Sequence, residues 1–489
     1  MAEKYILSID AGTTNCKAVI FDSEGKIKSR SATKMISFYP EDGSVEQNPY
    51  FIISAVKKTI NEALKLAKLE AKDMVAAGIT NQRETAMVWD RNTGIPVYNA
   101  IVWQDRRTEK IMKSVAEYTG MLREKTGLRP DPYFSAGKIQ WILDNVGNAR
   151  VKAKNNELIA GTVDSWLLYN LGNKKPEATD YTNASRTMLF NIHKLEWDNE
   201  LLELFNIPES MLAETKPSLN EYGTISIGSG TKIPVYSIIG DQQSALFGHG
   251  AIFNGMGKTT YGTGAFVLAN TGNELPDPGP LTGTIAYALE EKRASYAIEG
   301  SIFSAGAAIE WVKKLLKVNS YEKLEEMAGH AENLRAILVP AFTGLGSPYW
   351  DPDARGIISG INYSTGRNEM ARMAYESVAY QVQDVLHEIE KIMPVNELKV
   401  DGGLTRSDFL MQLQANLSDK RIIKTENVEV TAAGAAYIAG IVAGFWNINK
   451  ISSMPTAEKI YFPQEEKHAV KDKYVLWQRA VLRALEWKS

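Results

Sequence analysis

The chain has 489 residues, a formal net charge of −3, and a composition that is 44% hydrophobic and 23% charged. This length indicates two or more domains, and the charge provides no general attraction to nucleic acid or to an anionic membrane. The single cysteine, Cys16, excludes an intramolecular disulfide and a zinc site built from cysteines. Neither a secretion signal nor an apolar run of transmembrane length is evident, so we expect a cytoplasmic protein with no integral membrane segment.

The first half of the chain begins with strands and continues into mixed α/β structure. Its apolar patterns predict strands over 5–10, 16–22, 26–38, 75–80, 86–90, 97–103 and 235–239, and helices over 50–67, 137–145, 198–205 and 243–248. Between these elements, residues 104–220 are expected to be mostly helical, and the glycine-rich residues 222–234 to form a loop.

The second half has a similar plan. The patterns predict a strand-loop-strand over 259–272, strands near 284–298, a helix over 367–392, a strand, turn and helix over 398–417, and a helix of small residues over 431–445. We therefore expect two α/β domains of similar plan that face each other over a cleft. The boundary is placed near residue 250, which gives domains 1–250 and 251–489.

The turn at 12–15, "GTTN", has the chemistry of a phosphate loop, although it is neither a P-loop nor a dinucleotide fingerprint. A glycine lets successive N–H groups converge on one anion, and Lys17 adds a positive charge nearby. Asp10, at the strand end, can hold Mg²⁺ through water. The alternative is an ordinary polar hairpin turn. Similar glycine-rich turns at 262–264 and 402–403 favour the first interpretation, because three such turns can hold both ends of one nucleotide.

Two adjacent charged residues, Arg83 and Glu84, follow a predicted buried strand. A guanidinium donates to hydroxyl oxygens and a carboxylate accepts from hydroxyl protons, so the pair can bind an uncharged polyol. Trp103 and Tyr133 can pack on the carbons of such a ligand. The alternatives are a surface salt bridge for the charged pair and core positions for the aromatic residues.

Asp241 follows the apolar strand 235–239, at a strand end of the kind where α/β proteins bind ligands. An aspartate there can accept the proton of a hydroxyl group that attacks phosphorus. The alternative is the N-cap of the helix that follows, a position that aspartate readily occupies.

Nine stretches, in this order along the chain, resemble the FGGY carbohydrate kinase family: "DAGTTN", "GITNQRET", "NAIVWQDRRT", "DPYFS", "TDYTNASRTMLFNI", "GDQQSALFG", "TYGTGAF", "VPAFTGLGSPYWDPDARG" and "VDGGLTRSDFLMQ". The resemblance covers nearly the whole chain. It implies two actin-like (ribonuclease H-like) ATPase domains that close on ATP. It also implies Mg²⁺-dependent transfer of the γ-phosphoryl group to glycerol, which yields sn-glycerol 3-phosphate, and a homodimer or homotetramer.

The resemblance also implies roles for individual residues. The residues that would contact glycerol are Arg83, Glu84, Trp103, Tyr133, Asp241, Gln242 and Phe266, and Asp241 would also be the general base. The residues that would contact ATP are Thr13, Thr14, Asn15, Lys17, Thr263, Gly306, Glu310, Gly403 and Ser407. Asp10 would lie on the side of the magnesium ion. At three of these positions the chain departs from the family, which carries arginine, glutamine and asparagine where Lys17, Glu310 and Ser407 stand. The loop 228–232 is shorter than the bacterial loop that binds fructose 1,6-bisphosphate, so we do not expect that regulation.

Two other functions fit part of this pattern. A kinase for another polyol or for a ketose such as xylulose would share the fold but would need a roomier pocket. An actin-like ATPase that assembles filaments or acts as a chaperone would share the phosphate loops but lack the polyol-binding residues. A catalytically silent sensor is disfavoured by the presence of Asp10 and Asp241.

Overall fold

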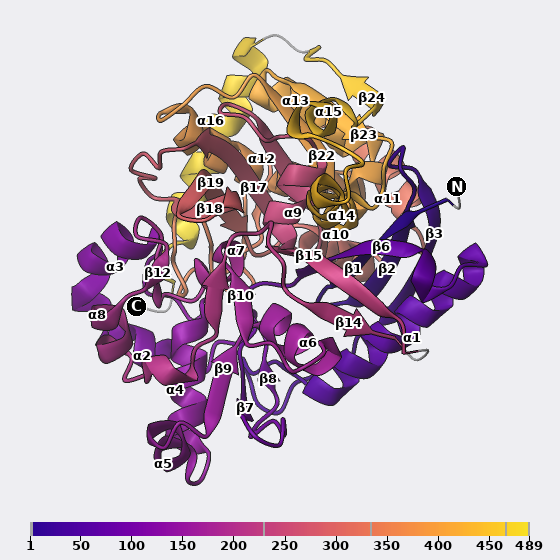
Figure 1. Ribbon diagram of the computed structural model, residues 1–489. Coiled ribbons are helices and arrows are strands. Elements are labelled where there is room, and N and C mark those ends of the chain that lie inside the picture. Colours follow the sequence, from indigo (N-terminus) through magenta and orange to yellow (C-terminus); the bar gives the residue numbers. More distant parts are fainter. Residues whose placement is uncertain (1–2, 228–229, 333–334, 465–466, 488–489) are drawn as a thin grey trace. The chain divides into compact units, whose positions relative to one another are not determined.

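The computed structural model describes residues 3–227, 230–332, 335–464 and 467–487. The chain forms two compact units (Figure 1). The first unit consists of Met1–Gly250, Gly283–Tyr296 and Glu429–Met454, and the second of Ala251–Thr282, Ala297–Val428 and Pro455–Ser489. The first long segment therefore ends at Gly250, and two later segments return to the first unit.

The main sheet of the first unit has the strand order β14-β15-β6-β1-β2-β3. These strands are β1 (Tyr5–Ala11), β2 (Asn15–Phe21), β3 (Ile27–Lys34), β6 (Met74–Asn81), β14 (Thr224–Ser226) and β15 (Lys232–Gly240). β1 is antiparallel to β2 and parallel to β6, which is parallel to β15. The C-terminal ends of β1, β6 and β15 therefore lie at one edge of the sheet.

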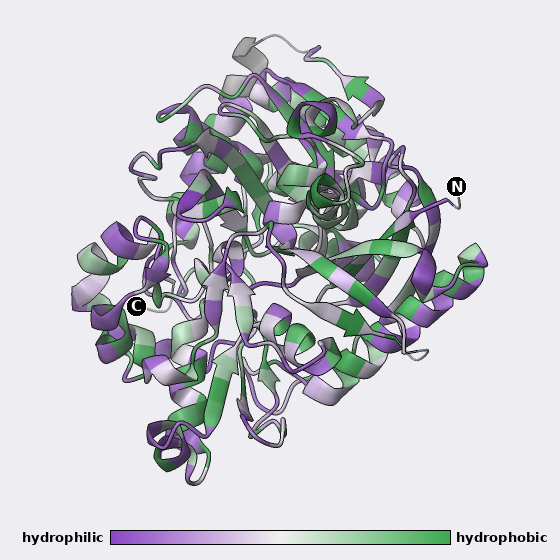
Figure 2. Cartoon of the chain, viewed as in Figure 1, coloured by the Kyte–Doolittle hydropathy of each residue, from purple (hydrophilic) through white to green (hydrophobic). Residues whose placement is uncertain are grey.

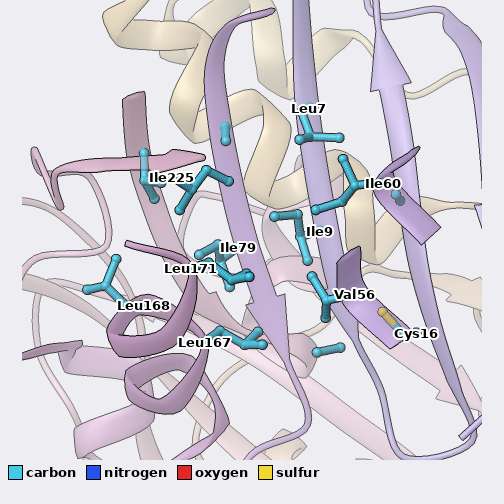
Figure 3. Packing of buried hydrophobic residues seen from close by; sticks show 14 of the residues in the cluster. Leu7, Ile9, Cys16, Val56, Ile60, Ile79, Leu167, Leu168, Leu171 and Ile225 are labelled. Carbon is cyan, nitrogen blue, oxygen red and sulfur yellow. The ribbon is translucent and has the colours of Figure 1, made fainter. Parts of the chain in front are cut away.

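One face of this sheet packs on α1 (Pro49–Ala67) and α6 (Val163–Leu171). Figure 3 shows Leu7 and Ile9 of β1 beside Val56 and Ile60 of α1 in this core. Helix α1 begins where the Asn48 side chain accepts hydrogen bonds from two N–H groups of its first turn, and Pro49 occupies its first position. Alternation along β1 sends Ser8, between Leu7 and Ile9, to the opposite face.

That opposite face is covered by α14 (Val430–Val442), which is mostly in the green of hydrophobic residues in Figure 2. Its small residues allow backbone contact with its neighbours. The Ser8 hydroxyl donates to the carbonyl of Ala432 at 2.7 Å. A Cβ on Gly434 would lie 1.9 Å from the carbonyl oxygen of Ser244 in α9 (Asp241–Gly248). The expectation of a closely packed helix of small residues over 431–445 is confirmed up to Val442, where α14 ends.

The other elements of the first unit are small sheets and short helices around the main sheet. The strands are β4 (Ser37–Phe38), β5 (Glu46–Gln47), β7 (Met87–Asp90), β8 (Ala100–Ile101), β9 (Leu158–Gly161), β10 (Ala178–Asp180), β11 (Phe190–Asn191), β12 (Glu196–Trp197) and β13 (Glu214–Lys216). The helices are α2 (Glu109–Ser114), α3 (Thr119–Thr126), α4 (Ser135–Asn145), α5 (Ala149–Lys154), α7 (Tyr181–Ala184), α8 (Asn199–Leu204) and α15 (Ile448–Ser453).

Three expectations about local structure in the first unit are corrected. Residues 104–220 include the short strands β9 to β13 as well as helices, because two- to four-residue strands leave too few positions for a period to be recognised. The expected loop 222–234 contains β14 and the start of β15, which pair with each other. The expected strand 26–38 is divided into β3 and β4.

A seven-stranded sheet has the order β18-β19-β17-β16-β22-β23-β24. These strands are β16 (Gly257–Tyr261), β17 (Ala265–Gly272), β18 (Thr282–Glu290), β19 (Arg293–Ile302), β22 (Glu397–Asp401), β23 (Arg421–Thr425) and β24 (Ala457–Tyr461). The second unit holds the end of β19 and the strands β17, β16, β22, β23 and β24 of this sheet, whereas Gly283–Tyr296, with nearly all of β18 and the start of β19, belongs to the first unit. β16 is antiparallel to β17 and parallel to β22, which is parallel to β23. β23 in turn is antiparallel to β24, as β15 is to β14.

The core of the second unit lies between this sheet and its helices, chiefly α12. The remaining elements are α10 (Gly306–Leu315), α11 (Tyr321–Gly329), α12 (Arg367–Glu390), α13 (Asp408–Ser418), α16 (Lys467–Ala484), the 3₁₀ helix η4 (Gly403–Arg406), β20 (Ile337–Val339) and β21 (Ile357–Ser359). Within the described ranges, no helix has both the length and the apolar character needed to cross a membrane.

Candidate functional site

The turn between β1 and β2 is held from two sides. The Gly12 N–H donates to the Asn15 carbonyl at 3.1 Å, and a Cβ on Gly12 would lie 2.9 Å from that oxygen. The Thr13 hydroxyl donates to Oε1 of Gln82 at 3.0 Å and accepts from the indole N–H of Trp103 at 2.8 Å. The turn and the aromatic residue Trp103 are therefore parts of one hydrogen-bonded assembly, while Thr14 and Asn15 are exposed.

Asp10 and Lys17 face each other across the β1–β2 ladder. Burial raises the pKa of Asp10 to about 7; the charge of Lys17 opposes this shift, and the charges of Asp241 and Glu429 add to it. The Lys17 ammonium lies 2.7 Å from the Glu429 carboxylate. The three carboxylates, together with Lys17, therefore form one electrostatic group at this end of the sheet.

Arg83, just after β6, connects several predicted polyol-binding residues. Its guanidinium donates to Oε1 of Gln243 at 3.1 Å and to the Tyr133 hydroxyl at 3.2 Å. Its Nε lies 3.5 Å from Oδ1 of Asp241 and 3.7 Å from Oε1 of Glu84. The Arg83 side chain is only 1% exposed, so this pair is a buried site and not the surface salt bridge considered from the sequence.

Glu84 is held by a residue to which the sequence assigned no role. Nε of Arg186 donates to Oε1 of Glu84 at 2.6 Å, and both side chains are buried. Glu84 has a φ of 62°, in the left-handed region that non-glycine residues rarely adopt. Such a conformation persists where surrounding contacts stabilise it, as Arg186 does here.

Aromatic residues form one wall beside Arg83. The rings of Trp103 and Tyr133 meet edge to face, with centroids 5.7 Å apart, and the Arg186 guanidinium lies 5.6 Å from the Tyr133 ring centroid. The fully buried Lys138 donates to the carbonyls of Tyr133 and Phe134. Burial lowers the pKa of Lys138 to about 7. Tyr133 is therefore fixed from both its ring and its backbone.

Asp241 is the first residue of α9, and Gly240 is the N-cap. The N-cap role that the sequence left open for Asp241 is therefore taken by its neighbour. Oδ1 of Asp241 accepts from the N–H of Gln242 at 2.7 Å and faces Nε of Arg83. The Asp241 side chain is 25% exposed, compared with 1% for Arg83. The carboxylate thus combines a buried positive neighbour with access to solvent, as a base that must meet a substrate requires.

In the second unit, five predicted nucleotide-binding residues line a single cavity of about 860 Å³, within the usual size range of ligand pockets. They are Thr263, Gly306, Glu310, Gly403 and Ser407. Aromatic residues complete the lining, namely Trp311, Tyr321, Phe342 and Tyr375. Polar loop residues and aromatic faces suit a ligand that has both phosphate or hydroxyl groups and a planar ring.

The turn between β16 and β17 is secured by α10. The N–H groups of Ala305 and Ala307 donate to the Thr263 carbonyl at 2.9 and 3.1 Å, and that of Gly306 donates to the Gly262 carbonyl at 3.0 Å. A Cβ on Gly306 would lie 2.6 Å from the Gly262 oxygen, so this contact requires glycine. Gly403, by contrast, has no heavy atom within 4 Å of its Cβ position, which is open space.

Glu310, a departure from the family pattern, is engaged on its own helix and on α11. Its carboxylate accepts from the Tyr321 hydroxyl at 2.7 Å and pairs with Lys313 at 2.9 Å. Lys313 and Tyr321, in that order of importance, hold the pKa of Glu310 down to about 2. Glu310 therefore presents a carboxylate to the cavity.

Ser407, another departure from the family pattern, is the N-cap of α13. Its hydroxyl accepts from the Leu410 N–H at 3.1 Å.

Phe266 lies on β17 in the second unit, opposite Thr260 in the ladder, and is half-buried. Gln242 follows Asp241 in α9 and is buried. The contacts of both residues with glycerol stay predictions. Residues 228 and 229 of the loop 228–232 lie outside the described residues. The expectation that this loop does not bind fructose 1,6-bisphosphate therefore stays a prediction.

The residues that the sequence missed share one property. Gln82, Lys138 and Arg186 are fully or almost fully buried polar side chains next to predicted site residues. All three occur in or beside stretches that resemble the family, but a sequence does not show which polar residues are buried. A charged residue in an otherwise apolar or small-residue stretch, such as Arg186 in "NASRTMLF", was the available signal.

The residues near Asp10 fit a magnesium ion of the kind that accompanies nucleotides. Mg²⁺ usually keeps several waters and binds one or two carboxylates plus substrate phosphates. Asp10 supplies one nearly buried carboxylate beside the Gly12–Asn15 turn. In the described part of the chain, no group of three or more His, Cys, Asp or Glu side chains is arranged to hold a metal ion.

Comparison with known proteins gives close relatives over the whole chain. A glycerol kinase of Thermococcus kodakarensis is 47% identical over 490 aligned residues, covering 99% of this chain and 98% of the relative. A protein named glycerol kinase 2 from Sulfolobus acidocaldarius is 45% identical and covers 100% of this chain and 99% of the relative.

Solved structures agree with this result. A crystal structure of Plasmodium falciparum glycerol kinase with ADP has a TM-score of 0.91 and 33% identity, covering 99% of this chain and 98% of that one. A xylulose kinase from Lactobacillus acidophilus has a TM-score of 0.86 at 22% identity, covering 98% and 97%, and shows the fold alone. The fold is the two-domain actin-like (ribonuclease H-like) fold.

Two family models match consecutive parts of the chain. The N-terminal domain of the FGGY family of carbohydrate kinases matches residues 5–248, and its C-terminal domain matches residues 257–443. Together with the full-length relatives, these matches show that the chain belongs to the FGGY family of carbohydrate kinases.

Proposed function

We propose that this protein phosphorylates glycerol with ATP and releases sn-glycerol 3-phosphate and ADP. The observation that carries the proposal is the position of the Arg83 guanidinium, 3.2 Å from the Tyr133 hydroxyl and 3.5 Å from the Asp241 carboxylate. Arg83 and Asp241 follow two adjacent parallel strands, β6 and β15, and the chain is 47% identical to a glycerol kinase over nearly its full length.

A polyol without charge needs donors, acceptors and an apolar surface. Arg83 and the Tyr133 hydroxyl provide donors, and the carboxylates of Glu84 and Asp241 provide acceptors. Trp103 provides an aromatic face beside Tyr133. We propose that Gln242 and Phe266 complete the glycerol-binding set. Because the charged groups are already paired with each other, a neutral ligand can bind without leaving an uncompensated buried charge.

Asp241 is the proposed general base. Its carboxylate takes the proton of a primary hydroxyl as that oxygen attacks the γ-phosphorus, and the bond from phosphorus to the ADP oxygen breaks in line. Nε of Arg83, 3.5 Å from Oδ1 of Asp241, helps to fix the orientation of this carboxylate.

ATP with Mg²⁺ supplies the phosphoryl group. We propose that Thr13, Thr14, Asn15, Lys17 and Thr263 bind its phosphates, that the second-unit cavity with Gly306, Glu310, Gly403 and Ser407 binds adenosine, and that Asp10 holds Mg²⁺ through water. The cavity's size and aromatic lining support a nucleoside. The Lys17 side chain also pairs with Glu429, so a phosphate would compete with that carboxylate.

A coupled assay of ADP release tests the proposal. Wild-type protein with Mg²⁺ and ATP is assayed alone, with glycerol, and with a panel of polyols and ketoses, and the product is identified. We expect strong stimulation by glycerol and sn-glycerol 3-phosphate as product. Strong activity on a different alcohol alone would mean that this alcohol, and not glycerol, is the substrate. ADP release that no alcohol changes would indicate an actin-like ATPase.

We further propose that the protein forms a homodimer or a homotetramer. Light scattering after gel filtration measures its mass in solution.

A further inference from the structure

We propose that residues 180–186, "DYTNASR", position the base and the polyol-binding pair for phosphoryl transfer, an inference that rests on the function proposed above. This segment, called here the positioning segment, spans the end of β10, the short helix α7 and the two residues after it. Its side chains reach three points of the candidate site: the strand end before Asp241, the strand end before Arg83, and the Glu84 carboxylate.

The first contact fixes the backbone that leads into Asp241. The N–H of Gly240 donates to the Thr182 hydroxyl at 2.8 Å, and that hydroxyl donates to Oδ1 of Asp180 at 2.9 Å. Gly240 is the N-cap of α9, and a Cβ there would lie 2.9 Å from Arg83 side-chain atoms. Thr182 is fully buried, so water does not replace it as an acceptor. The direction of the Asp241 side chain therefore depends on Thr182.

The second and third contacts fix the polyol-binding pair. Asn183 and Asn81 exchange two amide hydrogen bonds, at 2.9 and 3.2 Å. Asn81 is the last residue of β6, two positions before Arg83. Arg186 holds Glu84 through the 2.6 Å contact. One short segment thus connects the exits of β6 and β15, the two strands that bring Arg83 and Asp241 together.

The positioning segment has more buried polar side chains than are needed to fill space in the core. Asp180, Thr182, Asn183 and Arg186 are each 0% exposed, and burying such groups costs free energy unless each is hydrogen-bonded. Helix α7 has four residues, so its own hydrogen bonds are few. Asp180 orders the segment by accepting from the N–H groups of Thr182 and Asn183, both at 2.9 Å. The polar side chains are thereby aimed at the strand ends.

The main test compares Thr182→Val with Thr182→Ser and Thr126→Val. Valine keeps the shape of threonine but leaves Gly240 N–H without its acceptor, whereas serine keeps the hydroxyl. Thr126 of α3 is the matched control, since its buried hydroxyl also accepts from a backbone N–H, that of Leu128 at 3.1 Å, and donates to a carbonyl, that of Leu122 at 2.6 Å.

We expect Thr182→Val to lower kcat by about tenfold to a hundredfold, the range for a small misplacement of catalytic groups, with the KM for ATP within about twofold of wild type. Thr182→Ser should restore most of the activity. Thr126→Val should lower the melting temperature by a similar amount while keeping kcat within about twofold. A Thr182→Val enzyme with wild-type kcat, or an equal loss of kcat in Thr126→Val, would overturn the inference.

Arg186→Lys tests the other contact and does not depend on whether Thr182→Val folds. Lysine keeps the charge but loses the fixed fork and the aromatic stacking of arginine. Because Arg186 orients Glu84, we expect the KM for glycerol to rise more than about tenfold, with a smaller change in kcat. An unchanged KM for glycerol would contradict the inference. If the wild-type enzyme itself shows no response to glycerol, the proposed function fails, and that result is distinguishable from any difference among the variants.

Discussion

The two main sheets of the molecule have the same strand plan and different strand ends. In the first unit, β1 pairs with the antiparallel β2 and the parallel β6, and β6 with the parallel β15. In the second, β16 has the same relation to β17, β22 and β23. After β6 the chain places Arg83 and Glu84, and after the corresponding β22 it places Gly402 and Gly403. The ends of β6 and β22 thus carry charged side chains in the first sheet and glycines in the second.

The difference shows how one scaffold serves two kinds of ligand. In the first unit, buried side chains hold one another, as Arg186 holds Glu84, so the groups that would meet a small polyol are rigid. In the second unit, the turn at Gly262 and Thr263 is held by backbone N–H groups of α10, and Gly403 leaves open space. A large planar ligand needs such space more than it needs a dense array of charges.

The largest effect is expected at the end of β15, where the first sheet carries the proposed base. Asp241→Asn removes the proposed base and should lower kcat by about 10²–10⁴-fold, while glycerol remains bound. The matched control is Glu426→Gln, because Glu426 follows β23 at the position that corresponds to Asp241 after β15. Steady-state ADP release and glycerol binding by calorimetry measure the two properties. Near-normal turnover in Asp241→Asn would exclude Asp241 as the base.

Much of this comparison could be predicted from the sequence. The turns at 12–15 and 262–264, the strand exits at Arg83 and Asp241, and the helix of small residues 431–445 follow from local patterns of glycine, polar and apolar residues. The resemblance to the family then indicates which residues would bind glycerol and which would bind ATP. The five predicted nucleotide-binding residues of the second unit do line one cavity.

The contacts that hold the site could not be predicted in this way. Arg186 is 102 positions from Glu84, and Asn183 is 102 positions from Asn81, so no local period connects them. Whether a polar side chain is buried or exposed depends on which distant element covers it. The return of Glu429–Met454 to the first unit is likewise a result of tertiary packing, because the sequence pattern alone favours one boundary near residue 250.

A second test concerns the packing that supports Asp241. Gly434→Ala would place a Cβ 1.9 Å from the Ser244 carbonyl oxygen in α9, the helix that begins with Asp241. We expect the free energy of unfolding to fall by about 2–3 kcal/mol, as overpacking does, and turnover to fall with it. Gly120→Ala, in α3, is the control, because no heavy atom lies within 4 Å of its Cβ position. That change should be neutral or stabilising by about 0.5–1 kcal/mol in urea unfolding. Equal losses in the two variants would contradict the role of the α14–α9 contact.

A third test uses a buried carboxylate that serves the core of the second unit. Asp384 of α12 accepts from the hydroxyls of Tyr474 and Tyr349 at 2.6 and 3.0 Å and from the indole N–H of Trp477 at 2.7 Å. Burial raises its pKa from 3.8 to about 7 against the effect of these hydrogen bonds, and the charge of Glu388 adds to the rise. The folded state therefore binds a proton that the unfolded state releases between about pH 4 and pH 7.

Because the folded pKa is raised, the stabilisation is complete below the unfolded pKa and is lost as the pH rises through about 7. Between pH 6 and pH 8, Asp384 should lower the free energy of unfolding by about 1.4 kcal/mol. Asp384→Asn should remove this part of the pH dependence. Asp419→Asn, at a left-handed C-cap where asparagine is tolerated, should leave it unchanged. Urea unfolding at both pH values measures the difference, and an identical pH dependence in wild type and Asp384→Asn would exclude the assignment.

The smallest effect is expected for Gly403→Ala, which tests directly whether the strand ends of the second sheet bind the nucleotide and not glycerol. Gly403→Ala adds a methyl group to open space in the cavity, so folding should be unaffected, while a bound nucleoside would lose room. We expect the KM for ATP to rise by several-fold, on the order of the 1 kcal/mol that one methyl group contributes, with the KM for glycerol unchanged. Gly402→Ala is the contrasting variant, because Gly402 has a φ of 94° and its Cβ would lie 2.3 Å from the Tyr261 carbonyl oxygen. It should destabilise the fold whether or not ATP is present. If Gly403→Ala changed the KM for glycerol instead, the division of polyol-binding and nucleotide-binding residues between the two sheets would be wrong.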